Sequence, residues 1–265
     1  NALFTENTIQ RTLVAGISSS ESEGAILSGN IIHAESGVGF DLIGSSSLNL
    51  TGNTLTGDAE NGVFLLNSPE NTIMSNFFTA IENGIVLQRR IHDEGSYDNL
   101  IADNLVTSDT SILFCLRGGV GDVGILPKFG SDPVTPASEI SHTVLIASGP
   151  STDPVGFSYN PDPNPPANTW NATMLFSPNI AGGPYLGGNY WANADGTGWS
   201  QVTPDRGDGF CISPLVYDLN NIDHLPLHLF EGEIPITAPA VIDRPGKYRL
   251  TNDLVNSTVK TAISI

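Results

Sequence analysis

A unit of 23 residues recurs along the N-terminal part of the chain and limits the folds available to it. Each unit carries an apolar residue, two variable residues, an asparagine, one variable residue and a second apolar residue. The asparagines that mark the units are Asn7, Asn30, Asn53, Asn76 and Asn104, at steps of 23, 23, 23 and 28 residues. Three residues before them stand Phe4, Leu27, Leu50, Ile73 and Ile101. A repeat of this length is typical of a solenoid, in which each unit stacks on the one before it.

A second pattern follows each asparagine by eight or nine residues. Gly16, Gly39, Gly62 and Gly84 each stand before apolar residues that alternate with other residue types. Alternation with a period of two residues predicts β-strands. We expect the glycines to mark the corners at which these strands begin.

A parallel β-helix accommodates these patterns better than a leucine-rich repeat, whose leucine frame is absent. Each unit then forms one coil of short strands, and successive coils stack roughly 4.8 Å apart. Asparagine suits a corner, because its side chain tolerates left-handed backbone and can bond to its neighbours from coil to coil. The sequence therefore predicts an all-β, right-handed parallel β-helix with coils of about 23 residues, in which the five repeated asparagines form a structural ladder.

The charge balance restricts the partners of the chain. There are 28 acidic and 10 basic residues, which give a net charge of −18. Such a surface repels nucleic acid and anionic membrane, and it suits an exported protein. No apolar run is long enough to cross a bilayer. Cys115 and Cys211 allow one disulfide or two buried thiols, and sequons at Asn49, Asn171 and Asn256 would carry glycans only outside the cytoplasm.

The repeat loosens after residue 116, which divides the chain into three predicted parts. Residues 1–148 form the coils of the β-helix. Residues 149–231 begin with a proline-rich surface excursion and continue into a segment rich in Gly, Pro and Trp that caps the apolar columns. Residues 232–265 have the alternation of new strands and are expected to begin a following β-helical module.

The repeats resemble those of NosD-like and CASH-type (carbohydrate-binding and sugar hydrolase) parallel β-helix proteins. The resemblance is nearest to tandem-module archaeal cell-surface proteins, and it extends through "NTWNATMLF", "GGPYLGGNYW", "GDGFCISP" and "NIDHLPL". It implies an exported protein, extracellular or on the cell surface, in which the last of these segments close a module. The family version of the loop around residue 205 reads like an Asp-rich calcium motif, but Pro204, Arg206 and Ile212 replace three of its aspartates here. Asp195, Asp205 and Asp208 are the remaining candidate calcium ligands, and calcium usually takes about six to eight oxygens.

No other cofactor is expected. His224 and His228 have the spacing of a metal pair on a helix, but Pro226 breaks such a helix. Two methionines and two isolated cysteines are poor ligands for a soft metal such as copper.

An insertion of five residues between Asn76 and Asn104 is the best candidate for a ligand site. It gathers charged side chains on a loop that must protrude, because the next coil resumes the register: Arg89, Arg90, His92, Asp93 and Glu94. Loops on rigid scaffolds often bind ligands, although a charged loop can also be solvated surface. A polysaccharide hydrolase would need paired carboxylates across a groove, and a lyase would need a basic residue together with acid-bound calcium.

These features favour a structural protein without catalytic activity, acting as a spacer or as a subunit of a filament or sheath. Its expected partner is another copy of itself, joined head to tail through residues 232–265 and the coil that begins at Asn1, because an open coil end exposes unpaired backbone groups. The alternative is a β-helix that binds or degrades carbohydrate through residues 89–94. Surface glycans would be the partner in that case.

Overall fold

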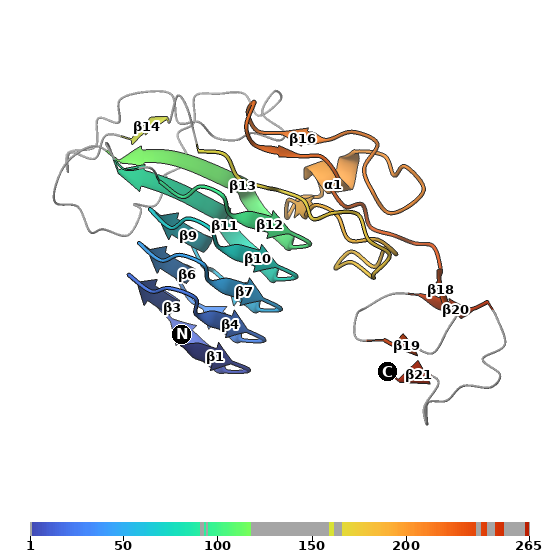
Figure 1. Ribbon diagram of the computed structural model, residues 1–265, viewed down its shortest axis with the longest axis horizontal. Coiled ribbons are helices and arrows are strands. Elements are labelled where there is room, and N and C mark those ends of the chain that lie inside the picture. Colours follow the sequence, from blue (N-terminus) through green and yellow to red (C-terminus); the bar gives the residue numbers. More distant parts are fainter. Residues whose placement is uncertain are drawn as a thin grey trace.

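The computed structural model describes residues 2–90, 93, 95–117, 159–161, 166–236, 240–242, 247–251 and 263–264. The prediction of a parallel β-helix is confirmed: strands from successive coils pair in parallel and rise from the N-terminus as a stack (Figure 1). Among the described residues, no helix has the length and apolar character needed to cross a bilayer.

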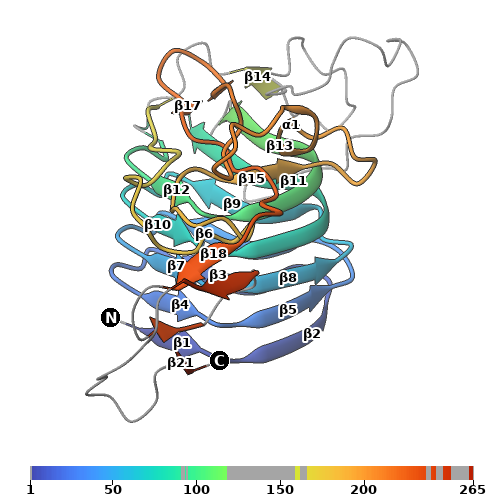
Figure 2. The same cartoon turned by 90° about the vertical axis from the view of Figure 1, so that its right-hand side faces the viewer.

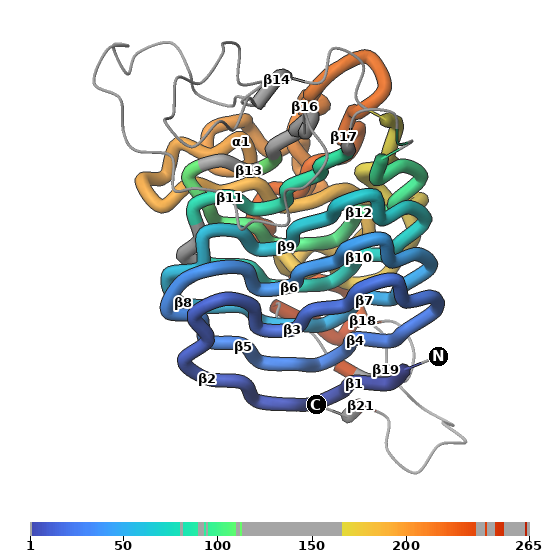
Figure 3. Tube along the Cα trace, turned by 90° about the vertical axis from the view of Figure 1, so that its left-hand side faces the viewer, coloured from blue at the N-terminus to red at the C-terminus, as the bar shows by residue number. Residues whose placement is uncertain are grey.

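One side of the stack is a five-stranded sheet to which successive coils contribute one strand each. In spatial order these strands are β1 (Leu3–Thr5), β4 (Ile26–Ser28), β7 (Asn49–Thr51), β10 (Thr72–Met74) and β12 (Leu100–Ala102). Their register follows the repeat, since Phe4 pairs with Leu27, Leu27 with Leu50 and Leu50 with Ile73. The predicted column of apolar residues therefore belongs to the core from Leu27 to Ile101. Figure 3 shows the coils of the chain stacked on one another.

The other sides of the coils form one larger sheet. The strands that the coils contribute to it are β2 (Thr8–Thr12), β5 (Ile31–Ala34), β8 (Thr54–Gly57), β3 (Ala15–Ser20), β6 (Val38–Ile43), β9 (Asn61–Leu66), β11 (Phe77–Arg90) and β13 (Leu105–Arg117). β11 is long because it runs along two sides of its coil and pairs with both β8 and β9, and β13 pairs along the length of β11. The longer step before Asn104 is absorbed between β11 and β12, so the coil above keeps its register.

The sharp corner before each ladder asparagine is made by left-handed backbone. Glu6, Gly29, Gly52, Ser75 and Asp103 occupy this corner with φ between 55° and 64°. Only glycine adopts this conformation without strain, and other residues lose about 1–2 kcal/mol. The repeated coil shape therefore holds even where the sequence supplies Glu, Ser or Asp.

The prediction that Gly16 and Gly39 mark corners is wrong. They lie inside β3 and β6, where a side chain would point into the narrow interior of the coil. A Cβ atom on Gly39 would lie 2.5 Å from Leu55 Cδ2 and 2.7 Å from the carbonyl oxygen of Gly62. Glycine recurs here because the coil above leaves no space.

Residues 166–227 add a further layer on the last regular coil. Thr169 bridges to Leu100, and β15 (Tyr190–Ala192) pairs in parallel with β13. The layer is completed by the helix α1 (Trp199–Val202) and by the antiparallel strands β16 (Leu215–Val216) and β17 (Ile222–Asp223). A short strand, β14 (Tyr159–Pro161), lies antiparallel to β13. The predicted boundary at residue 148 lies outside the described residues.

The chain then leaves this layer as a tail of short strands (Figure 2). β18 (Ile234–Ile236) pairs in parallel with β20 (Tyr248–Leu250), and β19 (Ala240–Val241) pairs in parallel with β21 (Ile263–Ser264). The second pair joins residues 240 and 263, which are one coil length apart. In Figure 1 these strands are drawn beside the coil stack rather than beneath β1.

Candidate functional site

The repeated asparagines form a hydrogen-bonded column along one corner of the stack. The side-chain amide of each donates to the side-chain oxygen of the next, at 2.9 Å for every step from Asn7 to Asn104. The backbone N–H of each asparagine donates to the same oxygen. Asn104 continues the column to Asn189, 85 residues further along the chain. Every asparagine above Asn7 is buried, so these bonds satisfy groups that water cannot reach.

A second asparagine column was not predicted. Asn71 accepts the backbone N–H of Leu48 and donates its own N–H to Asn99, which donates to Asn168. A sequence signal exists, because Asn71 and Asn99 each stand five residues before a ladder asparagine. It repeats in too few coils to be recognised without the structure.

Both columns end on an oxygen acceptor that also accepts the indole N–H of a buried tryptophan. Asn221 Oδ1 accepts the backbone N–H of Asn168 and the indole N–H of Trp170, at 3.1 and 2.9 Å. Asp223 Oδ2 accepts the backbone N–H of Asn189 and the indole N–H of Trp191, both at 2.9 Å. The two indoles and Tyr217 pack against one another, with ring centroids 5.1–6.2 Å apart. We call residues 166–227 the cap, because they close the columns at this end.

The carboxylate of Asp223 is buried and closely packed against its neighbours. Its other oxygen accepts the N–H of Leu225 at 3.1 Å, and a Cβ atom on Gly188 would lie only 1.8 Å from it. Burial raises the pKa of Asp223 to about 7, although the N–H donors around it favour the charged form. Burial also raises the pKa of the neighbouring Tyr217 well above its ordinary value, and the Asp223 carboxylate adds to that shift.

Cys211 lies in the same cap as a buried free thiol. Burial raises its pKa to about 12, and its sulfur lies 3.5 Å from the carbonyl oxygen of Leu227. A thiol with so high a pKa stays protonated and is a poor nucleophile.

The opposite end of the stack is open in the described part of the chain. Phe4 occupies the same inward column as Leu27, yet it is 39% exposed whereas Leu27 is 4% exposed. Leu13 and Val14, at the turn between β2 and β3, are 62% and 60% exposed. β1, β2 and β3 are the last strands of their sheets, so one edge of each carries backbone groups without a strand partner among the described residues. We call residues 2–20 the first coil and this surface its open edge.

The candidate calcium ligands are held by bonds within their own turns. Asp205 accepts the N–H groups of Gly207 and Gly209, and Asp208 forms an ion pair of 2.7 Å with Arg206. Asp195 accepts two hydrogen bonds from Thr197, which lower its pKa. The described residues contain no group of three or more His, Cys, Asp or Glu side chains able to hold a metal ion. Calcium binding at this loop stays a prediction.

The charged loop after β11 is described only in part. Arg89 and Arg90 belong to the end of β11, where their backbone pairs with residues 116 and 117 of β13. Asp93 is exposed and accepts a hydrogen bond from the side chain of Asn67 in the coil below. His92 and Glu94 lie outside the described residues. The hypothesis that residues 89–94 bind carbohydrate stays a prediction. It requires that the protein bind saccharide and that the double variant Arg89→Ala with Asp93→Ala lose this binding.

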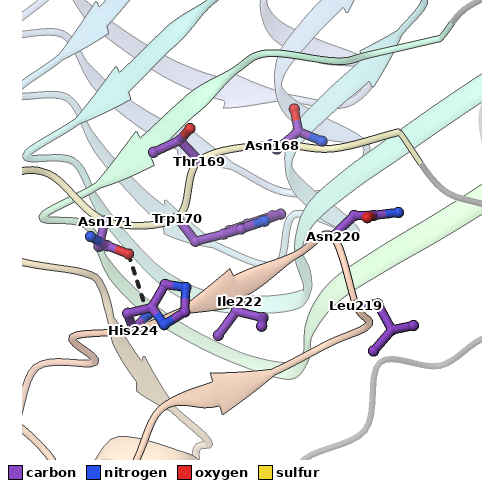
Figure 4. Close-up of a pocket in the computed structure, with 8 residues that line it drawn as sticks. All are labelled: Asn168, Thr169, Trp170, Asn171, Leu219, Asn220, Ile222 and His224. Atoms are coloured by element: carbon purple, nitrogen blue, oxygen red, sulfur yellow. Dashed lines mark hydrogen bonds between the residues drawn. The ribbon is translucent and has the colours of Figure 1, made fainter.

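Two of the sequons lie on the described surface. The Asn49 side chain is exposed in β7. Asn171 lines an open pocket of about 190 Å³ in the cap (Figure 4). Its side-chain oxygen accepts the backbone N–H of His224 at 3.3 Å. The pocket is lined by three asparagines and by Thr169, Trp170, Leu219, Ile222 and His224. Asn256 lies outside the described residues, and glycosylation of all three stays a prediction.

A family model described as periplasmic copper-binding protein (NosD) matches residues 1–112 and 156–196, more than half of the chain. The matched regions contain the coils, the asparagine ladder and the first part of the cap. The chain belongs to the NosD family. No curated protein and no solved structure matches it.

The family description raises the question of whether this NosD-family chain carries a copper site. The donors suited to copper in the described residues are Met74, Met174, Cys211 and the imidazoles of His33, His224 and His228. No three His, Cys, Asp or Glu side chains of the described part come together, and the Cys211 thiol is buried with a raised pKa. The described residues therefore do not fit a copper site.

Proposed function

We propose that the protein is an exported structural β-helix without catalytic activity, which serves as a spacer or as a head-to-tail subunit of a filament or sheath. The single observation behind the proposal is the asymmetry of the stack. At one end the two asparagine columns finish on Asn221 and Asp223, which also accept the indole N–H groups of buried tryptophans. At the other end the same apolar column finishes on the exposed side chain of Phe4.

An open edge of this kind favours addition of another coil. Unpaired N–H and C=O groups on an edge strand are a template for further pairing. Burial of an exposed Phe, Leu or Val side chain contributes about 1.5–3 kcal/mol, so covering Phe4, Leu13 and Val14 stabilises a stacked neighbour. A contact between unlike ends of identical copies continues into a filament unless it closes into a ring.

The proposed location is outside the cytoplasm, on the cell surface. Its support is the periplasmic description of the NosD family together with the net charge of −18, which favours solubility and disfavours nucleic-acid partners. The proposed partner is a second copy, whose residues 232–265 supply strands for the first coil. The parallel pairing of β18 with β20 and of β19 with β21 supports this choice.

Sedimentation and electron microscopy of the purified chain test the proposal. We expect elongated assemblies that grow with protein concentration and are lost in Phe4→Asp, since a carboxylate on the open edge opposes burial. Leu219→Asp is the matched control, because it adds the same charge at a residue that is 94% exposed on the cap. A chain that stays monomeric at all concentrations, or a Phe4→Asp variant that assembles as well as the control, would contradict the proposal.

A further inference from the structure

The tail strands β20 and β21 share one residue spacing with the coils of the stack, although the residues paired between β18 and β20 are 14 apart in the sequence. Phe4 and Ile17 are 13 residues apart and face the interior from β1 and β3, as do Leu27 and Phe40 in the next coil. Leu250 in β20 and Ile263 in β21 have the same separation of 13 residues. The equal separation matches Leu250 to Phe4 and Ile263 to Ile17.

The tail also has a covered side and an uncovered side. Ile234 and Ile236 of β18 are buried and pair with Tyr248 and Leu250 of β20. Leu250 is nevertheless 50% exposed. On the outer side of the same strands, Arg249 forms an ion pair of 3.1 Å with Glu233. Residues 248 and 250 therefore belong to the apolar side of the tail, and Leu250 is covered only in part.

We propose that the first coil of one copy stacks on β20 and β21 of a second copy, with Phe4 over Leu250 and Ile17 over Ile263. This inference rests on the proposed head-to-tail assembly and adds its register. Leu250 and Phe4 are both part-exposed apolar residues, and the parallel register then puts Thr5 beside Thr251. Neither threonine is charged, so the outer side of this strand pair brings no like charges together in a protein of net charge −18.

Disulfide trapping between two copies tests the register. Thr5→Cys and Thr251→Cys are made in separate copies of the full chain, which are mixed, assembled and oxidised. Neighbouring residues of parallel strands lie about 4.8 Å apart, within the Cα separation of about 4.4–6.8 Å that a disulfide allows. Arg249→Cys replaces Thr251→Cys in the control mixture, because a shift of two residues separates the Cα atoms by about 8 Å. The unaltered chain measures any linkage through Cys115 or Cys211.

We expect at least a tenfold excess of linked dimer from the Thr5→Cys and Thr251→Cys mixture over the control mixture. Equal yields from the two mixtures, or no linked dimer from either, would overturn the register. Assemblies that form normally without this linkage would overturn only the register and leave the proposed head-to-tail function standing. If neither assemblies nor the linkage formed, both the register and the proposed head-to-tail function would be overturned.

Discussion

Asn53 shows why a single residue type recurs at one corner of every coil. Its side-chain oxygen accepts the backbone N–H and the side-chain amide of Asn30, and its own amide donates to Asn76 and to the carbonyl oxygen of Leu27. A side chain here must accept from the coil below and donate to the coil above. Asparagine does both with one short planar group that also fits beside a left-handed corner.

Removal of this group is therefore expected to be costly within the stack. Asn53→Ala leaves buried N–H groups of Asn30 without an acceptor, and each such group costs about 1–3 kcal/mol. We expect the free energy of unfolding to fall by about 2–5 kcal/mol, measured by urea denaturation. Asn7→Ala is the control, because Asn7 lies at the open end with no described coil below it and should lose less than half as much. Equal losses in the two variants would argue against the ladder as a source of stability.

The buried carboxyl group of Asp223 makes the stability of the folded protein depend on pH. Its pKa is about 3.8 in the unfolded chain and about 7 in the folded protein. Since the folded pKa is raised, its contribution to stability is fully present below pH 3.8 and is lost as pH rises through 7. Between pH 4.5 and 7.5, Asp223 should make the folded protein less stable as pH rises.

Comparison with Asp223→Asn isolates this contribution from those of other acids. The amide oxygen of Asn can still accept from Asn189 and Trp191, so the cap keeps its main bonds. The urea midpoint of the variant should fall less than that of the unaltered protein between pH 4.5 and 7.5. Asp58→Asn, at an exposed position, controls for the loss of one negative charge. Parallel pH profiles for the unaltered protein and Asp223→Asn would contradict the expectation.

At the scale of elements, the cap takes the place of a further coil on top of the last regular one. Trp170 and Trp191 continue the inward columns above Ile101 and Val106, where the aliphatic positions of the regular coils end. Their rings cover the column ends, and their indole N–H groups bond to Asn221 and Asp223, which terminate the ladders. One side chain thus closes an apolar column and a polar column together.

The indole N–H of Trp191 should therefore contribute to stability apart from the ring. Trp191→Phe keeps an aromatic ring but removes the bond of 2.9 Å to the Asp223 carboxylate. We expect a loss of about 1.5–3 kcal/mol in the free energy of unfolding at pH 7.5, since a hydrogen bond to a charged group is among the stronger ones. The loss should be smaller at pH 4.5, where Asp223 is neutral. A loss that is the same at both pH values would indicate that only ring packing matters.

The coils were predictable from the sequence and the cap contacts were not, for a physical reason. A coil is defined by neighbours one repeat apart, so Asn30 and Asn53 reveal their contact through their spacing. Asn104 meets Asn189 and Asn99 meets Asn168 across 85 and 69 residues that carry no repeat, so spacing gives no sign of these contacts. The glycines of the second pattern were assigned to corners because sequence alone does not reveal that Gly39 faces the next coil.

At the scale of the whole molecule, the described part of the stack has unlike ends. The ladder bonds all run in one direction, from the donor in a lower coil to the acceptor in the coil above. The cap supplies final acceptors, whereas the side-chain oxygen of Asn7 has no described donor beneath it. An added coil would supply a donor to the side-chain oxygen of Asn7. The same coil would cover the exposed Phe4 at the end of the apolar column.

Amide hydrogen exchange measured across a dilution series tests most directly whether the open edge of the first coil is the assembly surface. At high protein concentration the amides of Leu3–Thr5, Thr8–Thr12 and Ala15–Ser20 should exchange slowly, and dilution should speed them at least tenfold, while those of Tyr190–Ala192 in the cap stay unchanged. Exchange in the first coil that is independent of concentration, or already as slow in dilute protein as that of Asn49–Thr51 in β7, would contradict an open edge that a second copy covers.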